Sequence, residues 1–193
     1  MQTFKYDPNI HHRRSIRLKG YDYSRAGLYF ITICCQDRIC RFGDVVDCEM
    51  VLNDAGRIAY NEWIKTTEIR NNVELGEFIV MPNHIHGIIR LLVRDELHSP
   101  DNKTPNMNNN KNNFPLRSPS QTIGAIIRGY KSSVTKQINN LANNGMGVFN
   151  TPQQLWQRNY WERIIRNQKA YHRITEYILN NPGKWHSDNF FKS

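Results

Sequence analysis

Two histidines, His84 and His86, stand two positions apart in the apolar stretch MPNHIHGIIRLL. In an extended strand, side chains at positions i and i+2 point to the same face, so both imidazoles could bind one metal ion. Ile85 between them would then point to the opposite face, into the apolar layer. Two unrelated polar residues on a solvated strand remain the alternative, because this spacing also occurs by chance. A metal site needs a third ligand from elsewhere in the chain.

The stretch NQKAYHRITEYILNNP supplies a candidate for that ligand. If it is a helix, Tyr177 and Asn181 lie on one face, since they are four positions apart. The amide oxygen of Asn181 can coordinate a hard divalent ion. Tyr177 lies at the flank of the apolar stripe and could reach a cleft, whereas Tyr171 lies within the stripe. The alternative is that Tyr177 is a boundary aromatic residue and Asn181 a helix C-cap.

A tyrosine beside a metal ion has a definite chemical use. The pKa of a phenol, near 10, makes it a poor nucleophile until its proton is drawn away. A divalent ion on a phosphodiester oxygen neutralises charge and aligns the group for in-line displacement. The products would be a covalent phosphotyrosine and a free 3′-hydroxyl. Because that link keeps the free energy of the phosphodiester, strand transfer would need no ATP.

The elements that position these residues follow from the hydrophobic pattern. Strands are expected over 28–35, 73–82 and 84–93, the last two split by the turn signal Pro82-Asn83, with a shorter strand or bend over 156–166. Helices are expected over 52–69, with Asn53 as N-cap, over 120–142, capped by Ser120, and over 167–181. This β-α-β-β-α-β order plus a C-terminal helix predicts an α+β fold, a ferredoxin-like sandwich with an antiparallel sheet that has one face covered by helices.

The length of 193 residues suits a single domain over 1–193. Within it, the Asn-rich segment 98–119 cannot bury enough apolar surface to fix its backbone, so a disordered spacer loop is predicted. No apolar run suits a membrane helix and no secretory signal begins the chain, which favours action in the bacterial cytoplasm, at the nucleoid. The cysteines, without a CxxC pair, are expected to be reduced thiols.

Three motifs in order, MPNHIHGIIRL, WQRNYWERIIRN and ITEYILNNP, resemble those of the single-tyrosine HUH transposases. The resemblance is to the IS200/IS605-like group and, more narrowly, to REP-associated tyrosine transposases, and it runs from about Leu28 to Trp185. It implies that His84, His86 and Asn181 bind a divalent metal, Mg²⁺ or Mn²⁺, and that Tyr177 is the nucleophile. It further implies an enzyme that nicks and rejoins single-stranded, hairpin-containing DNA through a 5′-phosphotyrosine intermediate, as a monomer or a homodimer.

The formal net charge of +9 agrees with a polyanionic partner. Single strands are held by stacking on aromatic side chains within a positive groove. The basic side chains expected to contact DNA are Arg13, Arg14, Arg17, Lys19, Arg128, Lys131 and Arg158. These segments could equally be separate solvated faces. The aromatic residues nearby, Tyr130, Trp156, Tyr160 and Trp161, are expected to serve packing rather than base stacking.

Two other functions compete with the enzyme. A protein of the same fold could grip hairpin DNA without cutting it, although a pure binder needs neither the histidine pair nor the tyrosine. An RNA-binding ferredoxin-like domain is a weaker alternative, because the chain lacks the aromatic strand motif of such domains.

Overall fold

The computed structural model describes residues 22–92, 121–143 and 154–191. In chain order the elements are β1 (Gly27–Cys34), the 3₁₀ turn η1 (Gln36–Arg38), β2 (Gly43–Val46), β3 (Glu49–Leu52), α1 (Asp54–Ile69), β4 (Val73–Val80), β5 (His84–Leu91), α2 (Ile123–Asn143), β6 (Trp161–Ile165), α3 (Gln168–Leu179) and the 3₁₀ segment η4 (Pro182–Ser187). The predicted loop over 98–119, the basic residues between Arg13 and Lys19, and Ser120 lie outside the described residues.

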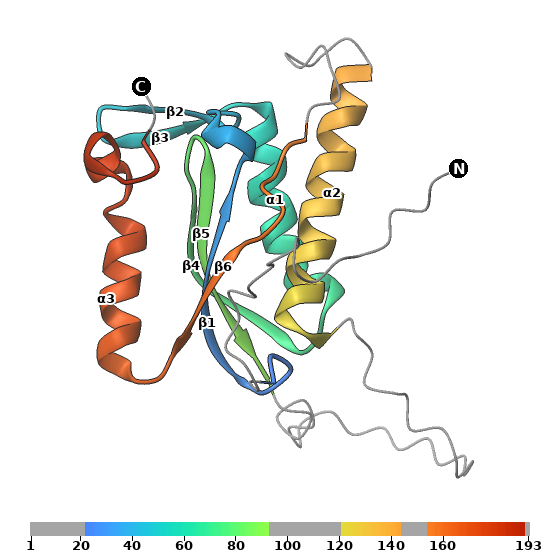
Figure 1. The fold of residues 1–193 in the computed structure, drawn as a ribbon, viewed down its shortest axis with the longest axis vertical. Helices are drawn as coiled ribbons and strands as arrows, with labels where there is room; N and C mark the ends of the chain where they lie inside the picture. Colours follow the sequence, from blue (N-terminus) through green and yellow to red (C-terminus); the bar gives the residue numbers. More distant parts are fainter. Residues whose placement is uncertain (1–21, 93–120, 144–153, 192–193) are drawn as a thin grey trace, which may run out of the picture.

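Four strands form one antiparallel sheet in the order β4-β5-β1-β6, with β5 and β1 in its centre (Figure 1). Leaving aside the small β2–β3 hairpin, the element order is β-α-β-β-α-β followed by α3. This confirms the predicted α+β, ferredoxin-like sandwich with an added C-terminal helix.

The helices lie on both faces of the sheet (Figure 1). α1 and α2 pack against one face, where Ile85 and Ile89 of β5 contribute to the larger core. α3 packs against the other face, where its Ile174 and Ile178 form a second, smaller core with Ile88. The β-α-β-β-α-β sandwich thus has one face covered by its two helices, as predicted, and the added helix α3 lies on the other face. The reason is the alternation along β5, which leaves Ile88 on the second face, where it needs an apolar partner.

Side-chain caps fix where the helices begin. Asn53 accepts a hydrogen bond from the amide of Gly56 at the start of α1, as predicted. Asn167 does the same for Ala170 at the start of α3. Both caps satisfy amides that have no partner within the helix, so they set the entry points of α1 and α3.

The β2–β3 hairpin was not expected from the sequence. Its two-residue turn, Asp47-Cys48, has positive φ angles of 50° and 64°. Such left-handed pairs match the twist of a hairpin and favour Asn or Asp followed by Gly. Asp47 fits this preference, but Cys48 stands where Gly is usual, so the turn was not recognised from the sequence. Phe42, which is fully buried just before β2, ties the hairpin to the larger core.

All four cysteines lie in the described ranges and are free thiols, as expected. Cys34 and Cys35 are buried at the end of β1, whereas Cys40 and Cys48 are exposed. Among the described helices, none combines the length and the apolar character that crossing a membrane requires.

Candidate active site

The two histidines open the central strand β5 and share one face of the sheet. Their ring centroids are 4.5 Å apart, and both side chains are buried, with 0% and 1% exposure. Ile85 between them belongs to the core on the opposite face. The predicted alternation is confirmed, and both imidazoles point to the face that carries α3.

Tyr177 reaches this pair from α3. Its phenolic oxygen lies 3.1 Å from Nε2 of His86. Phe30 of β1 holds both groups, because its ring stacks on His86 at 5.3 Å and meets the Tyr177 ring edge-on at 6.2 Å. Tyr177 is 39% exposed, so this side of the site faces solvent.

A hydrogen bond to Asn83 fixes the orientation of His84. Nδ1 of His84 lies 2.9 Å from Oδ1 of Asn83. The amide nitrogen of Asn83 donates to the backbone carbonyls of Arg38 and Phe190, which leaves Oδ1 as the acceptor. His84 therefore carries its proton on Nδ1 and presents Nε2 with a free lone pair. This Nε2 is buried and has no hydrogen-bond partner among the described residues.

His86 is held in the same way by Thr32 of the neighbouring strand. Nδ1 of His86 lies 2.8 Å from Oγ1 of Thr32, its cross-strand partner between β1 and β5. The contact engages Nδ1 and leaves Nε2 to face Tyr177. Such outer contacts commonly fix the tautomer and ring orientation of metal-binding histidines.

Asn181 contributes a buried side-chain oxygen, Oδ1, to the candidate site. It follows α3 and is 1% exposed. Its Nδ2 donates to Oδ2 of Asp188 at 3.1 Å, so its Oδ1 is turned away from that carboxylate. Oδ1 is also buried and without a hydrogen-bond partner among the described residues. Asp188, which also lies 3.4 Å from the phenolic oxygen of Tyr177, was not singled out from the sequence.

Burial dominates the electrostatics of the site. It lowers the pKa of His84 to about 3, against a smaller opposing effect of Asn181, and lowers the pKa of His86 well below its ordinary value. Burial and the Asp188 carboxylate together raise the pKa of Tyr177 to about 12. The imidazoles are therefore neutral at pH 7, as metal ligation requires, and the phenol needs a nearby positive charge before it can lose its proton.

These groups fit a divalent cation. Buried polar atoms without partners are rare, and two of them, Nε2 of His84 and Oδ1 of Asn181, belong to the predicted ligand set. Two imidazole nitrogens and one amide oxygen are ligands that divalent ions such as Mn²⁺ accept. No group of three His, Cys, Asp or Glu side chains within the described ranges could hold a metal ion, so the amide oxygen is needed to complete a three-ligand set.

The segment after η4 covers the histidines. The ring of Phe190 lies 4.5 Å from that of His84. Arg38 holds this segment, because it donates to the carbonyl of Asn189 at 2.7 Å and places its guanidinium 5.4 Å from the centre of the Phe190 ring. The open part of the site is therefore the side on which Tyr177 lies.

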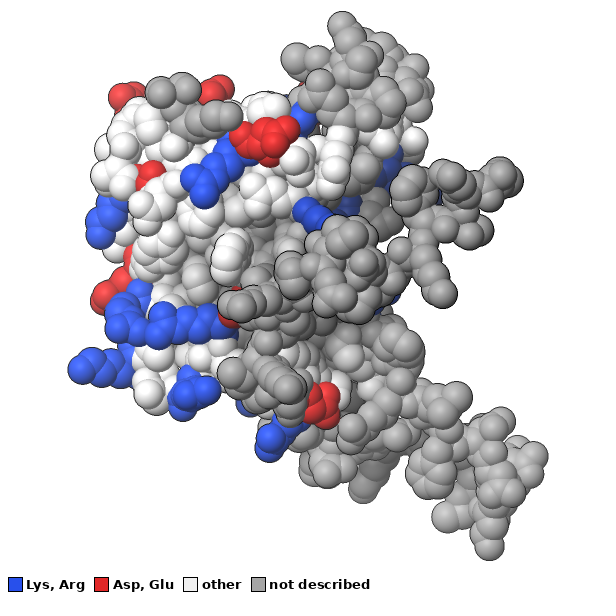
Figure 2. Space-filling view, viewed as in Figure 1, with Lys and Arg blue, Asp and Glu red and all other residues white. Residues whose placement is uncertain are grey.

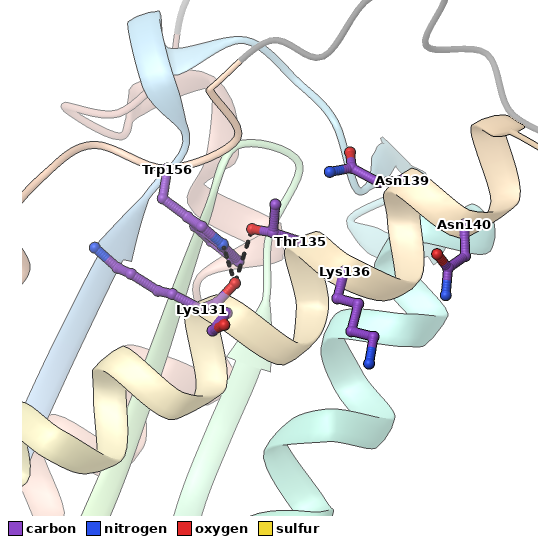
Figure 3. Close-up of a pocket in the computed structure, with 7 residues that line it drawn as sticks. Lys131, Thr135, Lys136, Asn139, Asn140 and Trp156 are labelled. Carbon is purple, nitrogen blue, oxygen red and sulfur yellow. Dashed lines mark hydrogen bonds between the residues drawn. The ribbon is translucent and has the colours of Figure 1, made fainter.

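The basic residues predicted on α2 are not brought to this site, since α2 packs on the opposite face of the sheet. Arg128 is exposed there. Lys131 lines a pocket with Trp156, Lys136 and neighbouring α2 residues (Figure 3). Its ammonium group donates to the carbonyls of Gln157 and Asn159, both at 2.8 Å, and burial lowers its pKa to about 8. Lys131 thus anchors the segment that leads into β6, and its contact with DNA stays a prediction.

Of the remaining predictions on basic and aromatic residues, some stay untested, some are confirmed and one is wrong. Arg158 is exposed ahead of β6, and the expected DNA contacts of Arg128 and Arg158 stay predictions. Tyr130 and Trp156 are buried, which confirms that they serve packing. Trp161 is 59% exposed, so the expectation that it serves packing is wrong. It lies on β6, which is an edge strand of the sheet in the described part of the chain.

Comparison with known proteins finds others of similar sequence or similar fold. No family model matches the chain. A Haemophilus influenzae protein that carries the name "Uncharacterized protein" is 41% identical over 191 residues, which cover 98% of both chains. A second protein of that organism, provisionally named a REP-associated tyrosine transposase, is 28% identical over 169 residues, 84% of this chain and 74% of the relative. The solved structure of a REP-associated tyrosine transposase bound to a REP hairpin superposes with a TM-score of 0.52, at 20% identity, over 88% of this chain and 74% of that one.

A ferredoxin-like sheet with a histidine pair on a central strand, facing a tyrosine on the C-terminal helix, is the arrangement expected of the single-tyrosine HUH class. The chain belongs to the same family as its 41%-identical relative. Its similarity to REP-associated tyrosine transposases, predicted from the three motifs, is confirmed by the sequence match and by the shared fold.

Proposed function

We propose that this protein is a metal-dependent transposase that nicks and rejoins single-stranded DNA next to a hairpin, through a 5′-phosphotyrosine on Tyr177. One observation carries the proposal. The phenolic oxygen of Tyr177 lies against Nε2 of His86, beside two buried atoms without partners, Nε2 of His84 and Oδ1 of Asn181. The relative whose structure contains a REP hairpin supports hairpin DNA as the partner.

His84, His86 and Asn181 would hold the divalent cation, Mg²⁺ or Mn²⁺. When bound, such an ion neutralises a phosphodiester oxygen and favours loss of the phenol proton. Asn83 and Thr32 keep the two Nε2 atoms turned inward, and Asp188 does the same for the oxygen of Asn181. These three contacts pre-organise the ligands before substrate arrives.

In the cleavage step the phenolate oxygen of Tyr177 attacks phosphorus. A bond forms between that oxygen and phosphorus, and the bond from phosphorus to the 3′-oxygen of the preceding nucleotide breaks. The phenol gives up one proton, and the departing 3′-oxygen gains one. If Nε2 of His86 were occupied by a cation, the carboxylate of Asp188, 3.4 Å from the phenolic oxygen, would accept the phenol hydrogen bond instead. Reversal of the step with another 3′-hydroxyl rejoins the strand.

Hairpin binding without cleavage is the second candidate, and one observation favours it. Both histidines are almost fully covered, in part by Phe190. A protein that had lost catalysis could keep its site closed in this way. The retained ligands and the adjacent phenol favour the enzyme, because hairpin binding alone requires none of them.

A covalent-adduct assay separates the two candidates. The protein is incubated with Mn²⁺ and a labelled hairpin oligonucleotide carrying a single-stranded extension, and is then run on a denaturing gel. We expect a slower-migrating protein–DNA adduct that is lost in Tyr177→Phe and kept in Tyr171→Phe. Tyr171 is a matched control because it packs in the apolar stripe of the same helix. Hairpin binding by the wild-type protein with no adduct would favour the non-cutting alternative.

A further inference from the structure

Trp161 is a large aromatic side chain that the fold leaves in water. It is 59% exposed, whereas the other three tryptophans of the chain, Trp63, Trp156 and Trp185, are exposed by 6% or less. An indole gains strongly from burial, and a flat aromatic surface suits stacking on another ring. The position of Trp161 relative to the candidate active site decides what such a ring could be.

The sheet register places Trp161 in line with the histidine pair. Thr32 of β1 is the cross-strand partner of His86 on one side and of Trp161 on the other. Directly opposed residues of antiparallel strands point to the same face. Because neighbouring strands are about 4.8 Å apart, the backbone of Trp161 lies about 10 Å from that of His86. Trp161 and the candidate active site thus share one face.

That face of β6 is open along most of its length. Trp161 and Arg163, which alternate with residues of the opposite face, are both exposed. Ile165, at the far end of the strand, is buried in the small core with α3. Since β6 is an edge strand, the surface beside Trp161 continues to the rim of the sheet. Thr32, which lies between His86 and Trp161, is itself buried, so Trp161 and Arg163 are the exposed part of this face of β6 beside the candidate active site.

The charge along this surface suits a nucleic-acid strand. Arg163 faces the same way as Trp161, since its partner Phe30 lies on the face with His86. Glu162 between them is paired with Ile31, on the opposite face. Lys and Arg side chains also gather over the lower part of α3 and the adjoining end of β6 (Figure 2). An exposed ring next to cations is the combination by which proteins bind single strands, with bases on the rings and phosphates on the cations.

We propose that Trp161 stacks on a nucleobase of the single strand that flanks the hairpin, with Arg163 against the adjoining phosphate. The proposal rests on the proposed function, because it identifies where that substrate strand lies next to Tyr177. This stack holds the DNA single strand in place across β1. The phosphate that joins the hairpin to its single-stranded extension then reaches the phenol of Tyr177.

Tryptophan fluorescence tests this inference separately from cleavage. The experiment uses the Tyr177→Phe background without metal, and the probe is a hairpin oligonucleotide with or without an oligo-dT extension, because base stacking tolerates any sequence. We expect the extension to quench fluorescence, and the quench to vanish in Trp161→Phe, since the other three indoles are buried. Trp185→Phe should keep the quench.

Affinity provides the second readout. Trp161→Ala should weaken binding of the extended oligonucleotide by about 5- to 100-fold and leave the plain hairpin unaffected, as expected for the loss of one base stack. Trp161→Tyr should keep most of the affinity. Ile69→Ala, a truncation of a 71% exposed side chain at the end of α1, serves as control. A quench that persists in Trp161→Phe, or unchanged binding by Trp161→Ala, would overturn the inference. Neither result would bear on adduct formation by wild-type protein.

Discussion

The phenolic oxygen of Tyr177 lies 3.1 Å from Nε2 of His86 within one chain, although the two residues are 91 positions apart. The contact exists because α3 folds back over the face of the sheet on which β5 displays its histidines. One subunit therefore contains the nucleophile and all three candidate metal ligands.

This arrangement predicts that two inactive variants, one without the histidine and one without the tyrosine, cannot restore adduct formation when they are mixed. His86→Ala and Tyr177→Phe should each fail to form the covalent adduct. A mixture of the two should remain as inactive as either alone, because each subunit lacks a part that its own α3 or β5 must supply. Adduct in the mixture, with none in the separate variants, would show that α3 exchanges between subunits of a dimer.

Asp188 is predicted to act on metal affinity through Asn181. Asp188→Ala removes the acceptor that turns the Asn181 oxygen inward, so Mn²⁺ affinity should fall by about tenfold or more, the usual loss when such an outer contact is removed. Asp188→Asn keeps an acceptor and should lose much less. Electron paramagnetic resonance of free Mn²⁺ measures both. If the two variants lost affinity equally, the charge of Asp188 rather than its hydrogen bond would matter.

Stability of the metal-free protein should depend on pH through the buried histidines. The pKa of His84 is about 3 in the folded chain, and an unfolded histidine has a pKa of about 6.5. Between these values the unfolded chain binds a proton that the folded chain does not. The contribution of this histidine to the free energy of unfolding is therefore complete above the unfolded pKa of about 6.5. It decreases as the pH falls from there toward the folded pKa.

Urea unfolding between about pH 7.5 and pH 5.5 checks this dependence. A double variant, His84→Ala with His86→Ala, should show a flatter decline over the same range. An equally steep decline in the double variant would assign the effect to other groups.

Gly87 is predicted to be required for packing behind the histidines. A Cβ at this position would collide with Cζ2 of Trp63 and would lie 3.1 Å from Cβ of Phe78, so an added methyl group forces the core beneath α1 to shift. Gly87→Ala should lower the free energy of unfolding by about 1–3 kcal/mol. Gly183→Ala is the matched control, because nothing lies within 4 Å of its added Cβ. Equal melting temperatures for the two variants would show that Trp63 can move without cost.

The sequence predicted those parts of the fold that repeat a hydrophobic period. α1, β4, β5 and α3 have apolar residues at helical or alternating spacing, and clear caps or turns mark their ends. The β2–β3 hairpin has four-residue strands that are largely exposed and a turn with Cys48 where Gly is usual, so it was not recognised from the sequence. The face chosen by α3 depends on apolar residues of several strands, among them Ile88, Ile165 and Phe30. Which of them share a face is known only once the sheet register is known.

Only those residues of the candidate site that lie in the sequence motifs were predicted. His84, His86, Tyr177 and Asn181 follow from spacing and from resemblance, and the structure brings all four together. The residues that orient them could not be found in this way. Asp188 lies in an irregular segment after η4, and its contact with Asn181 depends on the three-dimensional path of that segment. Trp161 is similar, because only the sheet register reveals that it shares a face with His86.

A crystal soaked in Mn²⁺ and measured for anomalous scattering tests the central claim most directly. We predict one strong anomalous peak within bonding distance of Nε2 of His84, Nε2 of His86 and Oδ1 of Asn181, on the side toward the oxygen of Tyr177. In Asn181→Leu crystals the peak should be lost or greatly weakened. A Mn²⁺ peak elsewhere, with these three atoms free of metal at saturating concentration, would contradict the account.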